Sequence, residues 1–464
     1  MSHDTNLTPY LPMWESLDKR PLPAWFSAAK FGIFIHWGVY SVPAWRPLGD
    51  ERYASYAEWY YASVIGDMQQ GGDAFHKARY GQDFEYRDFG PLFTAEFFDA
   101  DYWADLFRRS GAGYVVLTSK HHDGYCLWPC KSPYKKNWNS FDVGPRRDLL
   151  GELSSAVRNQ GLKMGLYYSI IEWESTWTHR DPSGYYVDRR LVDKYRIPED
   201  EYVDKHLMPQ LRELVENYQP ALIFSDGGEW DGSEEYWQTK EFLAWLYNEA
   251  PNKDEVVVND RWAKDMPGKH GDYFSSEYQD TDAVGADHPW EESRGVGGSY
   301  GYNRAENIDD YSTLRELVHE LIDVVGRGGN FLLNVGPTAD GRIPVVMQDR
   351  LRGIGAWLAV NGEAIYGTRQ WRASGAVSGA CGPDLHYTAK SDDLYVLCTQ
   401  WPERDLRIAG CDGEGIRVEM LGLARAISWR MEGEYLVISP PVISPAEVPC
   451  EHAYCFKISN AVAG

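Results

Sequence analysis

A carboxylate at the end of a buried strand is the first feature of this sequence that could do chemistry. Residues 221–224 read ALIF, a short apolar run typical of a fully buried parallel strand. The run is followed by Ser225, Asp226 and two glycines. Enzymes built on parallel barrels place their reacting groups at the carboxyl ends of strands. Asp226 is therefore a candidate catalytic acid, although an aspartate at such a place can also do no more than cap the following turn.

Six further polar side chains stand at or just past the ends of other apolar runs. Buried polar groups cost free energy unless they are paired, so packing alone does not account for such a collection. Strand ends that converge on one centre would bring these groups together. The complete set is His36, His121, His122, Tyr167, Asp226, Arg261 and Glu277.

Two kinds of hydrolysis fit this set. Histidines and carboxylates can hold a divalent metal ion, but the HxH and HExxH spacings are missing. The adjacent His121 and His122 would also point to opposite faces if both lay on one strand. Glycoside hydrolysis needs two carboxylates that flank one bond, with His and Arg side chains to hold sugar hydroxyls. Asp226 and Glu277 come from different strands of one rim, which permits that arrangement.

The elements that must position these groups alternate between strands and helices. About eight apolar runs are separated by helical patterns such as residues 147–160, where Leu149, Leu153 and Val157 recur at i, i+4 and i+8. This alternation predicts a parallel sheet. Polar groups at so many strand ends favour a (β/α)8-like barrel over a doubly wound sheet. Residues 295–300, GVGGSY, also fail the GxGxxG pattern of dinucleotide-binding folds.

The style of the sequence changes after residue 367. Helical periods disappear, and short β-branched or apolar pieces recur every 8 to 12 positions between turn residues. We therefore expect an α/β catalytic barrel over residues 1–368 and an antiparallel β-sandwich over residues 369–464. Residues 43–92 form a long excursion after the first strand, and we expect a lid or a substrate wall there.

Composition limits the partners and the compartment. The formal net charge of −23 argues against nucleic acid and against an anionic membrane surface as partners. The sequence has no run of 18 apolar residues, so we expect no membrane span. Aromatic residues make up 14% of the chain, which suits sugar rings as well as cores. The seven cysteines lack paired CxxC spacing, so we expect mostly free thiols in a reducing compartment. Residues 1–7 show no signal pattern, and we expect a cytoplasmic protein.

Several blocks of the sequence resemble glycoside hydrolase family 29, the α-L-fucosidases. The resemblance spans roughly residues 10–370, and its blocks occur in the order that the family has. They are FGIFIHWGVYSVPAW at 31–45, EWY at 58–60, TSKHHDGYCLW at 118–128, WNS at 138–140, GPRRD at 144–148, NDRW at 259–262, GYN at 301–303, GNFLLNVGP at 329–337 and NGEAIY at 361–366.

The resemblance implies a retaining exo-α-L-fucosidase that removes terminal fucose from glycans or oligosaccharides by double displacement, with no cofactor and no metal. Its acid/base is left open between Glu277 in DYFSSEY and Glu291 in PWEE, and we favour Glu277. An apolar wall would suit the C5 methyl group of fucose, a 6-deoxy sugar. The matching positions are Asp226 as nucleophile; His36, His121, His122, Tyr167 and Arg261 as sugar-binding residues; and Glu58 and Trp59 as the wall beside the sugar.

Two other functions stay open at this point. One is a metal-dependent barrel hydrolase, and the other is a barrel that binds fucose without catalysis. The sequence also leaves open the fucosyl linkage, the aglycone and whether the chain forms a homo-oligomer. The C-terminal sandwich could bind carbohydrate or only support the barrel, and we favour support.

Overall fold

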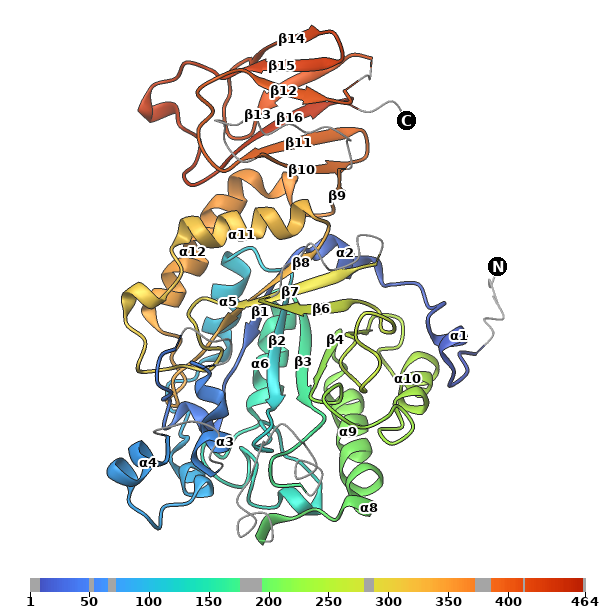
Figure 1. Ribbon diagram of the computed structural model, residues 1–464, viewed down its shortest axis with the longest axis vertical. Coiled ribbons are helices and arrows are strands. Elements are labelled where there is room, and N and C mark those ends of the chain that lie inside the picture. Colours follow the sequence, from blue (N-terminus) through green and yellow to red (C-terminus); the bar gives the residue numbers. More distant parts are fainter. Residues whose placement is uncertain are drawn as a thin grey trace.

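The computed structural model describes residues 9–49, 54–65, 72–175, 194–278, 288–371, 385–411 and 414–461. A parallel sheet lies at the centre with helices around it, and an all-β unit stands at one end of the molecule (Figure 1). The central strands are β1 (Phe31–Ile35), β2 (Tyr114–Lys120), β3 (Lys163–Ser169), β4 (Leu222–Asp226), β5 (Val257–Val258), β6 (Phe274–Glu277), β7 (Trp290–Gly295) and β8 (Asn330–Val335).

The eight central strands form one curled sheet in the order β5-β4-β3-β2-β1-β8-β7-β6, and every neighbouring pair is parallel. The outer strands β5 and β6 do not pair in a ladder, and their edges are joined by contacts of residues in and beside them, among them Ser275 Oγ, which donates to Asp260 Oδ1 at 2.7 Å. The backbone N–H of Asp272 donates to Val258 O at 3.0 Å, and Asp272 Oδ2 accepts from the Val258 N–H at 2.9 Å. The predicted (β/α)8-like barrel is therefore confirmed, with a seam between β5 and β6 in place of a regular ladder.

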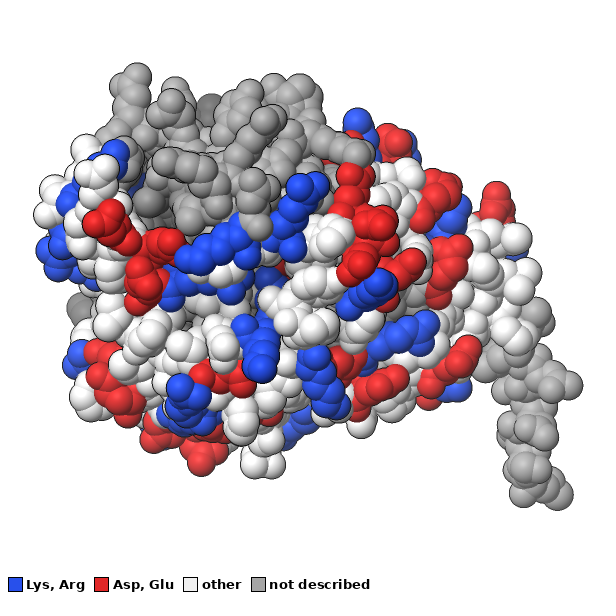
Figure 2. Space-filling view, turned by 90° about the horizontal axis from the view of Figure 1, so that it is seen from below, with Lys and Arg blue, Asp and Glu red and all other residues white. Residues whose placement is uncertain are grey.

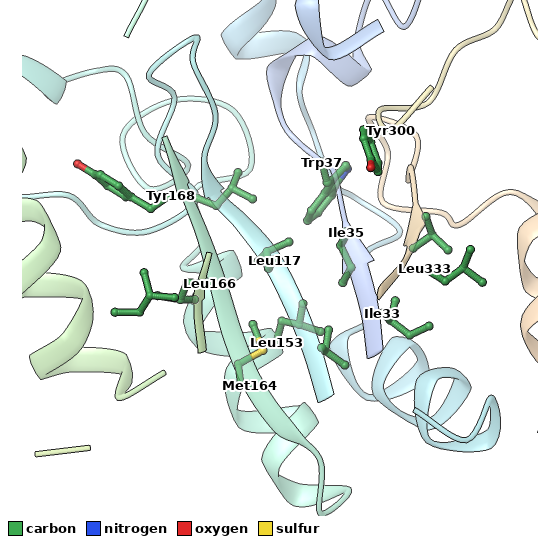
Figure 3. Packing of buried hydrophobic residues seen from close by; sticks show 14 of the residues in the cluster. Ile33, Ile35, Trp37, Leu117, Leu153, Met164, Leu166, Tyr168, Tyr300 and Leu333 are labelled. Atoms are coloured by element: carbon green, nitrogen blue, oxygen red, sulfur yellow. The ribbon is translucent and has the colours of Figure 1, made fainter. Parts of the chain in front are cut away.

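Residues alternate between the two faces of each barrel strand. Ile33, Ile35 and Leu166 point outward and pack with helix α6 (Leu149–Asn159) and its neighbours in the main hydrophobic core (Figure 3). Phe34 and Tyr167, one position away, point into the barrel and join a separate interior cluster. Since the side-chain period of a strand is two, this alternation also fixes which residues at the strand ends face the barrel axis.

Helices cover the outside of the sheet. Three of them begin with a side-chain N-cap: Asp99 accepts from the Tyr102 N–H, Asp148 from the Gly151 N–H, and Thr313 forms a capping box with Glu316. None of the described helices is long and apolar enough to cross a membrane. Besides α6, the helices are α1 (Trp14–Leu17), α2 (Ala24–Ala29), α3 (Tyr60–Ile65), α4 (Gly72–Tyr80), α5 (Ala100–Arg109), α8 (Glu199–Glu201), α9 (Met208–Tyr218), α10 (Thr239–Asn248), α11 (Leu314–Gly326) and α12 (Val345–Asn361).

Two elements depart from a plain alternation of apolar strands and α-helices. Residues 199–218 form α8, a π-helical segment (Tyr202–Leu207) and α9 in succession. Strand β7 covers Trp290–Gly295, ahead of most of the glycine-rich residues 295–300. The segment WEESRG lacks an apolar run, and its burial is provided by the neighbouring strands β6 and β8 rather than by its own hydrophobicity.

The C-terminal strands form two antiparallel sheets that enclose a second core, as the predicted sandwich requires. This unit packs against α11 and α12 (Figure 1). Trp357 Nε1 on α12 donates to Ala453 O at 3.0 Å, and His319 Nε2 on α11 donates to His452 O at 2.9 Å. Its strands are β9 (Arg369–Gln370), β10 (Leu385–Lys390), β11 (Asp393–Cys398), β12 (Leu406–Ala409), β13 (Arg417–Met420), β14 (Ser428–Glu432), β15 (Tyr435–Ser439) and β16 (Tyr454–Ser459).

Candidate active site

A pocket of about 270 Å³ lies at the carboxyl ends of the barrel strands. The structure brings nine of the candidate residues from the sequence analysis to its wall, and only the alternative acid/base Glu291 lies elsewhere. This set comprises His36, Glu58, Trp59, His121, His122, Tyr167, Asp226, Arg261 and Glu277.

Strand alternation positions three of these residues. Phe34, Gly165 and Phe224 belong to the inward-facing set of β1, β3 and β4, and His36, Tyr167 and Asp226 follow each of them by two positions. Residues two apart on a strand share a face, so all three side chains point toward the barrel axis. The pocket continues the barrel interior beyond the carboxyl ends of the strands.

The two adjacent histidines were expected to face opposite sides, and this expectation is wrong. β2 ends at Lys120, so the alternation of the strand no longer applies to His121 and His122. Their rings lie 4.3 Å apart between centroids, and both line the pocket. His122 Nδ1 is 2.5 Å from Ser169 Oγ, and its Nε2 is 3.4 Å from Asp226 Oδ2.

Asp226 is held by several polar groups. The Tyr167 hydroxyl donates to Asp226 Oδ2 at 2.6 Å, and Arg261 Nη1 lies 3.4 Å from Oδ1. Burial raises the pKa of Asp226, but His122, Arg261 and the Tyr167 hydrogen bond outweigh it, and the pKa is lowered overall. Asp226 is therefore ionised near neutral pH, as a nucleophile must be.

Arg261 links the two predicted catalytic carboxylates. Its Nη1 is 3.4 Å from Asp226 Oδ1 and 3.2 Å from Glu277 Oε2, and its Nε donates to Ser275 Oγ at 2.9 Å. The Tyr56 hydroxyl donates to the other oxygen of Glu277, Oε1, at 2.8 Å. The guanidinium plane thus fixes the relative positions of two acids that come from β4 and β6.

Glu58 and Trp59 form one wall of the pocket from a 3₁₀ turn, Ala57–Trp59, within the excursion after β1. Glu58 Oε2 accepts from the Gly301 N–H at 2.8 Å and from Ser299 Oγ at 3.2 Å. Burial raises the pKa of Glu58 to about 7 in spite of these donors. The ring of Trp59 lies 5.8 Å from that of Trp230, so the wall is aromatic.

The three pocket histidines are neutral. Burial lowers the pKa of His36 to about 3 and that of His122 to about 4, and it lowers the pKa of His121 well below the ordinary value. His36 Nδ1 is tied to Asn334 Oδ1 at 2.7 Å, while His121 Nδ1 is buried without a partner in the described part of the chain. Neutral imidazoles with a free nitrogen can bind hydroxyl groups without adding a charge.

Glu291, the alternative acid/base, lies elsewhere. Its side chain is 1% exposed on β7, does not line the pocket, and accepts a hydrogen bond from the Tyr114 hydroxyl in the barrel interior. Burial raises its pKa to about 8, which makes it a neutral core acid near pH 7.

Several pocket residues were not singled out from the sequence. The most consequential is Glu229, three positions past Asp226; its signal was a second carboxyl directly after the glycine turn. Tyr56 gives a weaker signal, a polar side chain two positions before the candidate Glu58. The others are Phe34, Phe224, Trp230, Pro267, Ser275, Ser293 and Tyr300.

The pocket opens on the side of the molecule toward which the carboxyl ends of β2 and β3 are directed. Figure 2 shows that face, where Lys and Arg side chains form a row between acidic groups, next to segments that are not described. Among the described residues, no group of three or more His, Cys, Asp or Glu side chains is arranged to hold a metal ion. The polar side chains that line the pocket include carboxyls, imidazoles, hydroxyls and one guanidinium.

Paired carboxylates in a pocket at the carboxyl ends of a parallel barrel are typical of glycoside hydrolases. The family model described as Alpha-L-fucosidase matches residues 1–363, and the one described as Alpha-L-fucosidase C-terminal domain matches residues 379–459. This chain belongs to the α-L-fucosidase family and is a glycoside hydrolase.

Individual relatives agree over nearly the whole chain. The tissue α-L-fucosidase of Bos taurus is 42% identical over 99% of this chain and 93% of its own length. The plasma α-L-fucosidase of Homo sapiens is 41% identical over 98% of this chain and 93% of its own. The crystal structure of Thermotoga maritima α-fucosidase with a mechanism-based inhibitor has a TM-score of 0.82 at 37% identity, and covers 97% of this chain and 100% of its own.

Proposed function

We propose that this protein hydrolyses terminal α-L-fucosides with retention of configuration, with Asp226 as nucleophile and Glu277 as acid/base. The observation that carries the proposal is the shared guanidinium nitrogen between them. Arg261 Nη1 is 3.4 Å from an oxygen of Asp226 and 3.2 Å from an oxygen of Glu277. The distance between these two oxygens therefore cannot exceed the sum of the two values, and it equals that sum only if the three atoms lie on one line. Retaining pairs stand about 5–5.5 Å apart and inverting pairs about 6.5–9.5 Å apart, and the shared nitrogen favours the shorter separation.

In the first step, an Asp226 oxygen attacks the anomeric carbon. The bond to the leaving oxygen breaks, its electron pair goes to that oxygen, and Glu277 supplies the proton. The Tyr167 and Arg261 contacts hold Asp226 in place for this attack. The product is a fucosyl ester of Asp226 together with the released alcohol.

In the second step, water attacks the same carbon and the Glu277 carboxylate takes its proton. The ester bond to Asp226 breaks, and its electron pair returns to the carboxylate. Two displacements at one carbon restore the starting configuration, so fucose leaves as the α-anomer.

Recognition of the sugar rests on the neutral histidines and the aromatic wall. His36, His121 and His122 present imidazole nitrogens to hydroxyl groups, and Trp59 offers an apolar surface to the C5 methyl group. The pocket volume of about 270 Å³ suits a single sugar unit, which supports action at chain ends. The proposed substrates are fucosylated oligosaccharides or glycoconjugates.

We also propose that the protein works in a reducing compartment such as the cytoplasm. Five cysteines in the described part of the chain, Cys126, Cys130, Cys398, Cys450 and Cys455, are free thiols, three of them buried, while Cys381 lies outside the described residues.

An aryl α-L-fucoside tests the proposal directly. We expect hydrolysis that a chelator does not change, and proton NMR should detect the α-anomer of fucose before mutarotation. The β-anomer as first product would establish inversion and overturn the two-step mechanism. Loss of activity with chelator would favour a metal-dependent hydrolase instead, and tight fucose binding without release would favour a binding protein.

A further inference from the structure

We propose that Glu229 is a positioning residue, which keeps a proton and donates it in a hydrogen bond to Asp226, so that the nucleophile stays ionised and oriented. The inference rests on the proposed role of Asp226. It assigns a task to a carboxyl that the two-step mechanism above does not use.

The turn after β4 brings Glu229 beside Asp226. Gly227 has a φ of +84°, a conformation that favours glycine, and a Cβ on Gly228 would stand 2.3 Å from Trp262 O. The two glycines therefore let the chain fold back tightly over the loop that carries Arg261. As a result Glu229 lines the same pocket as the strand-end aspartate, with its side chain only 15% exposed.

Three carboxyl groups share the charge of one guanidinium in this pocket. Arg261 Nη1 faces three carboxyls: Asp226 at 3.4 Å, Glu277 at 3.2 Å and Glu229 at 4.0 Å. Asp226 and Glu229 both lie within 4.0 Å of this one nitrogen and line the same pocket, so the two carboxyls are close neighbours. Two ionised carboxylates in contact repel each other, whereas a carboxylic acid beside a carboxylate forms a strong hydrogen bond. One of the two must therefore hold a proton.

The surroundings place that proton on Glu229. Asp226 accepts from the Tyr167 hydroxyl and faces Arg261, so protein groups stabilise its ionised form. Glu229 Oε2 is buried and receives no N–H or O–H donor from the described residues, and Oε1 stands 4.0 Å from the guanidinium. Burial first, and then the charge of Asp226, raise the pKa of Glu229 well above its ordinary value.

The hydrogen bond bears on both chemical steps. It keeps Asp226 ionised in the free enzyme and fixes which oxygen lone pair faces the sugar. When the ester breaks in the second step, the electron pair returns to Asp226, and a hydrogen bond to a neutral ester becomes one to an anion, which is stronger. Glu229 therefore favours the return of the nucleophile to its anionic form.

Three variants test the inference. Glu229→Gln keeps an N–H donor toward Asp226 but cannot ionise, and Glu229→Ala removes the donor. Glu320→Gln is the matched control, because Glu320 is also a carboxyl beside an arginine, with Oε1 2.9 Å from Arg294 Nε, but it does not line the pocket. Thermal unfolding should show all three folded, and kcat/KM on an aryl fucoside should be followed from pH 2.5 to 8.

We expect Glu229→Ala to lose about 10- to 100-fold in kcat/KM, the usual cost of a hydrogen bond to a charged group. Without the donor, the pKa of Asp226 rises. Because Asp226 acts as an anion, the acid limb of the profile then moves to higher pH. Glu229→Gln should stay within about 3-fold of the wild type with an unmoved acid limb, as should Glu320→Gln.

Two results would overturn the inference. If Glu229→Gln is as impaired as Glu229→Ala, the carboxylate form of Glu229 is the one that matters. If the acid limb of Glu229→Ala does not move, Glu229 does not act through Asp226. Trapping of the fucosyl ester on Asp226 in the wild type reports separately on the proposed mechanism, so failure of the two proposals can be told apart.

Discussion

Three carboxyl groups face one arginine in this pocket, and their other partners give them different tasks. Asp226 has a tyrosine hydroxyl and the guanidinium, which lower its pKa and keep it ionised. Glu229 stands 4.0 Å from the same guanidinium, its Oε2 has no donor among the described residues, and it keeps a proton. Glu277 accepts from Tyr56 and reaches the pocket from another strand. Residue type alone does not separate the three, whereas their environment does.

The acid/base assignment predicts a specific behaviour for Glu277→Ala. An aryl fucoside has a good leaving group and needs little protonation, so the first step should be spared while the second is slowed. We expect fucosyl-enzyme to accumulate, azide to restore turnover as a small external nucleophile, and natural linkages to lose about 10²–10⁴-fold. Burst kinetics and identification of fucosyl azide measure these effects.

The control for this prediction is Glu291→Gln. Glu291 is a neutral acid in the barrel interior, so an amide of the same shape should leave kcat/KM within a few-fold and show no response to azide. Rescue of a Glu291 variant by azide, with only a raised KM for Glu277→Ala, would exchange the roles of the two residues.

Much of the site was predictable at this scale because strands alternate. His36, Tyr167 and Asp226 stand at strand ends in phase with inward-facing residues, which a period of two makes visible in the sequence. Tyr56 and Ser293 could not be identified in this way. They enter the pocket from a 3₁₀ region and from a polar strand, and neither segment has a period that marks its inner face.

At the scale of elements, the turn after β4 is the piece that sets the relation between two carboxyls. A Cβ on Gly228 would meet the backbone oxygen of Trp262 at 2.3 Å, and the backbone there cannot give way as a flexible side chain could. Gly228→Ala should therefore displace the loop that carries Glu229. We expect a loss of about 1–3 kcal/mol in the free energy of unfolding and a fall in kcat of at least about 10-fold.

Gly326→Ala at the end of α11 is the matched control for this turn. The nearest atom to its added Cβ is His386 Cβ at 3.4 Å, an ordinary contact. Denaturant unfolding and steady-state kinetics compare the two variants. Equal stability and equal activity for both would show that the β4 turn adapts and does not determine the position of Glu229.

Elements were predicted well where their own sequence is apolar or periodic. They were predicted poorly where a polar segment is buried only because neighbouring elements cover it. The apolar runs of β1, β2 and β4 and the period of α6 were visible in the sequence. β7 was missed because its residues are polar, and the π-helical segment before α9 has no distinct pattern. The seam between β5 and β6 depends on separate contacts of Asp272 and of Ser275 with Asp260, which no local sequence pattern predicts.

At the scale of the whole molecule, the C-terminal sandwich shares its core with the barrel. Tyr395, Leu397 and Cys455 of the sandwich belong to the same buried cluster as the outer faces of the barrel strands. The bond from Trp357 to Ala453 and the bond from Thr388 Oγ1 to Ala364 O at 2.6 Å join the two units as well. These contacts favour a supporting role for the sandwich, and the boundary between residues 368 and 369 stays a prediction.

Two tryptophan variants separate support from carbohydrate binding. Trp357→Ala removes a buried side chain at the junction and should cost about 3–5 kcal/mol in the free energy of unfolding. Trp429→Ala on β14 removes an exposed ring, 38% accessible, of the kind that binds sugars. For a supporting sandwich, the second change should leave both stability and the KM for fucosylated glycans unaltered. A raised KM for glycans, with no change for aryl fucosides, would instead identify a carbohydrate-binding module.

The central claim, that Asp226 forms the fucosyl ester, is tested most directly by trapping that ester. A 2-deoxy-2-fluoro-L-fucosyl fluoride should inactivate the enzyme and add one fluorofucosyl group per chain. Because Asp226 and Glu229 fall in the same short peptide, the label must be located by fragmentation to the residue. We expect it on Asp226, with no label in Asp226→Asn. A label on Glu229 or Glu277, or turnover without any trapped ester, would contradict the account.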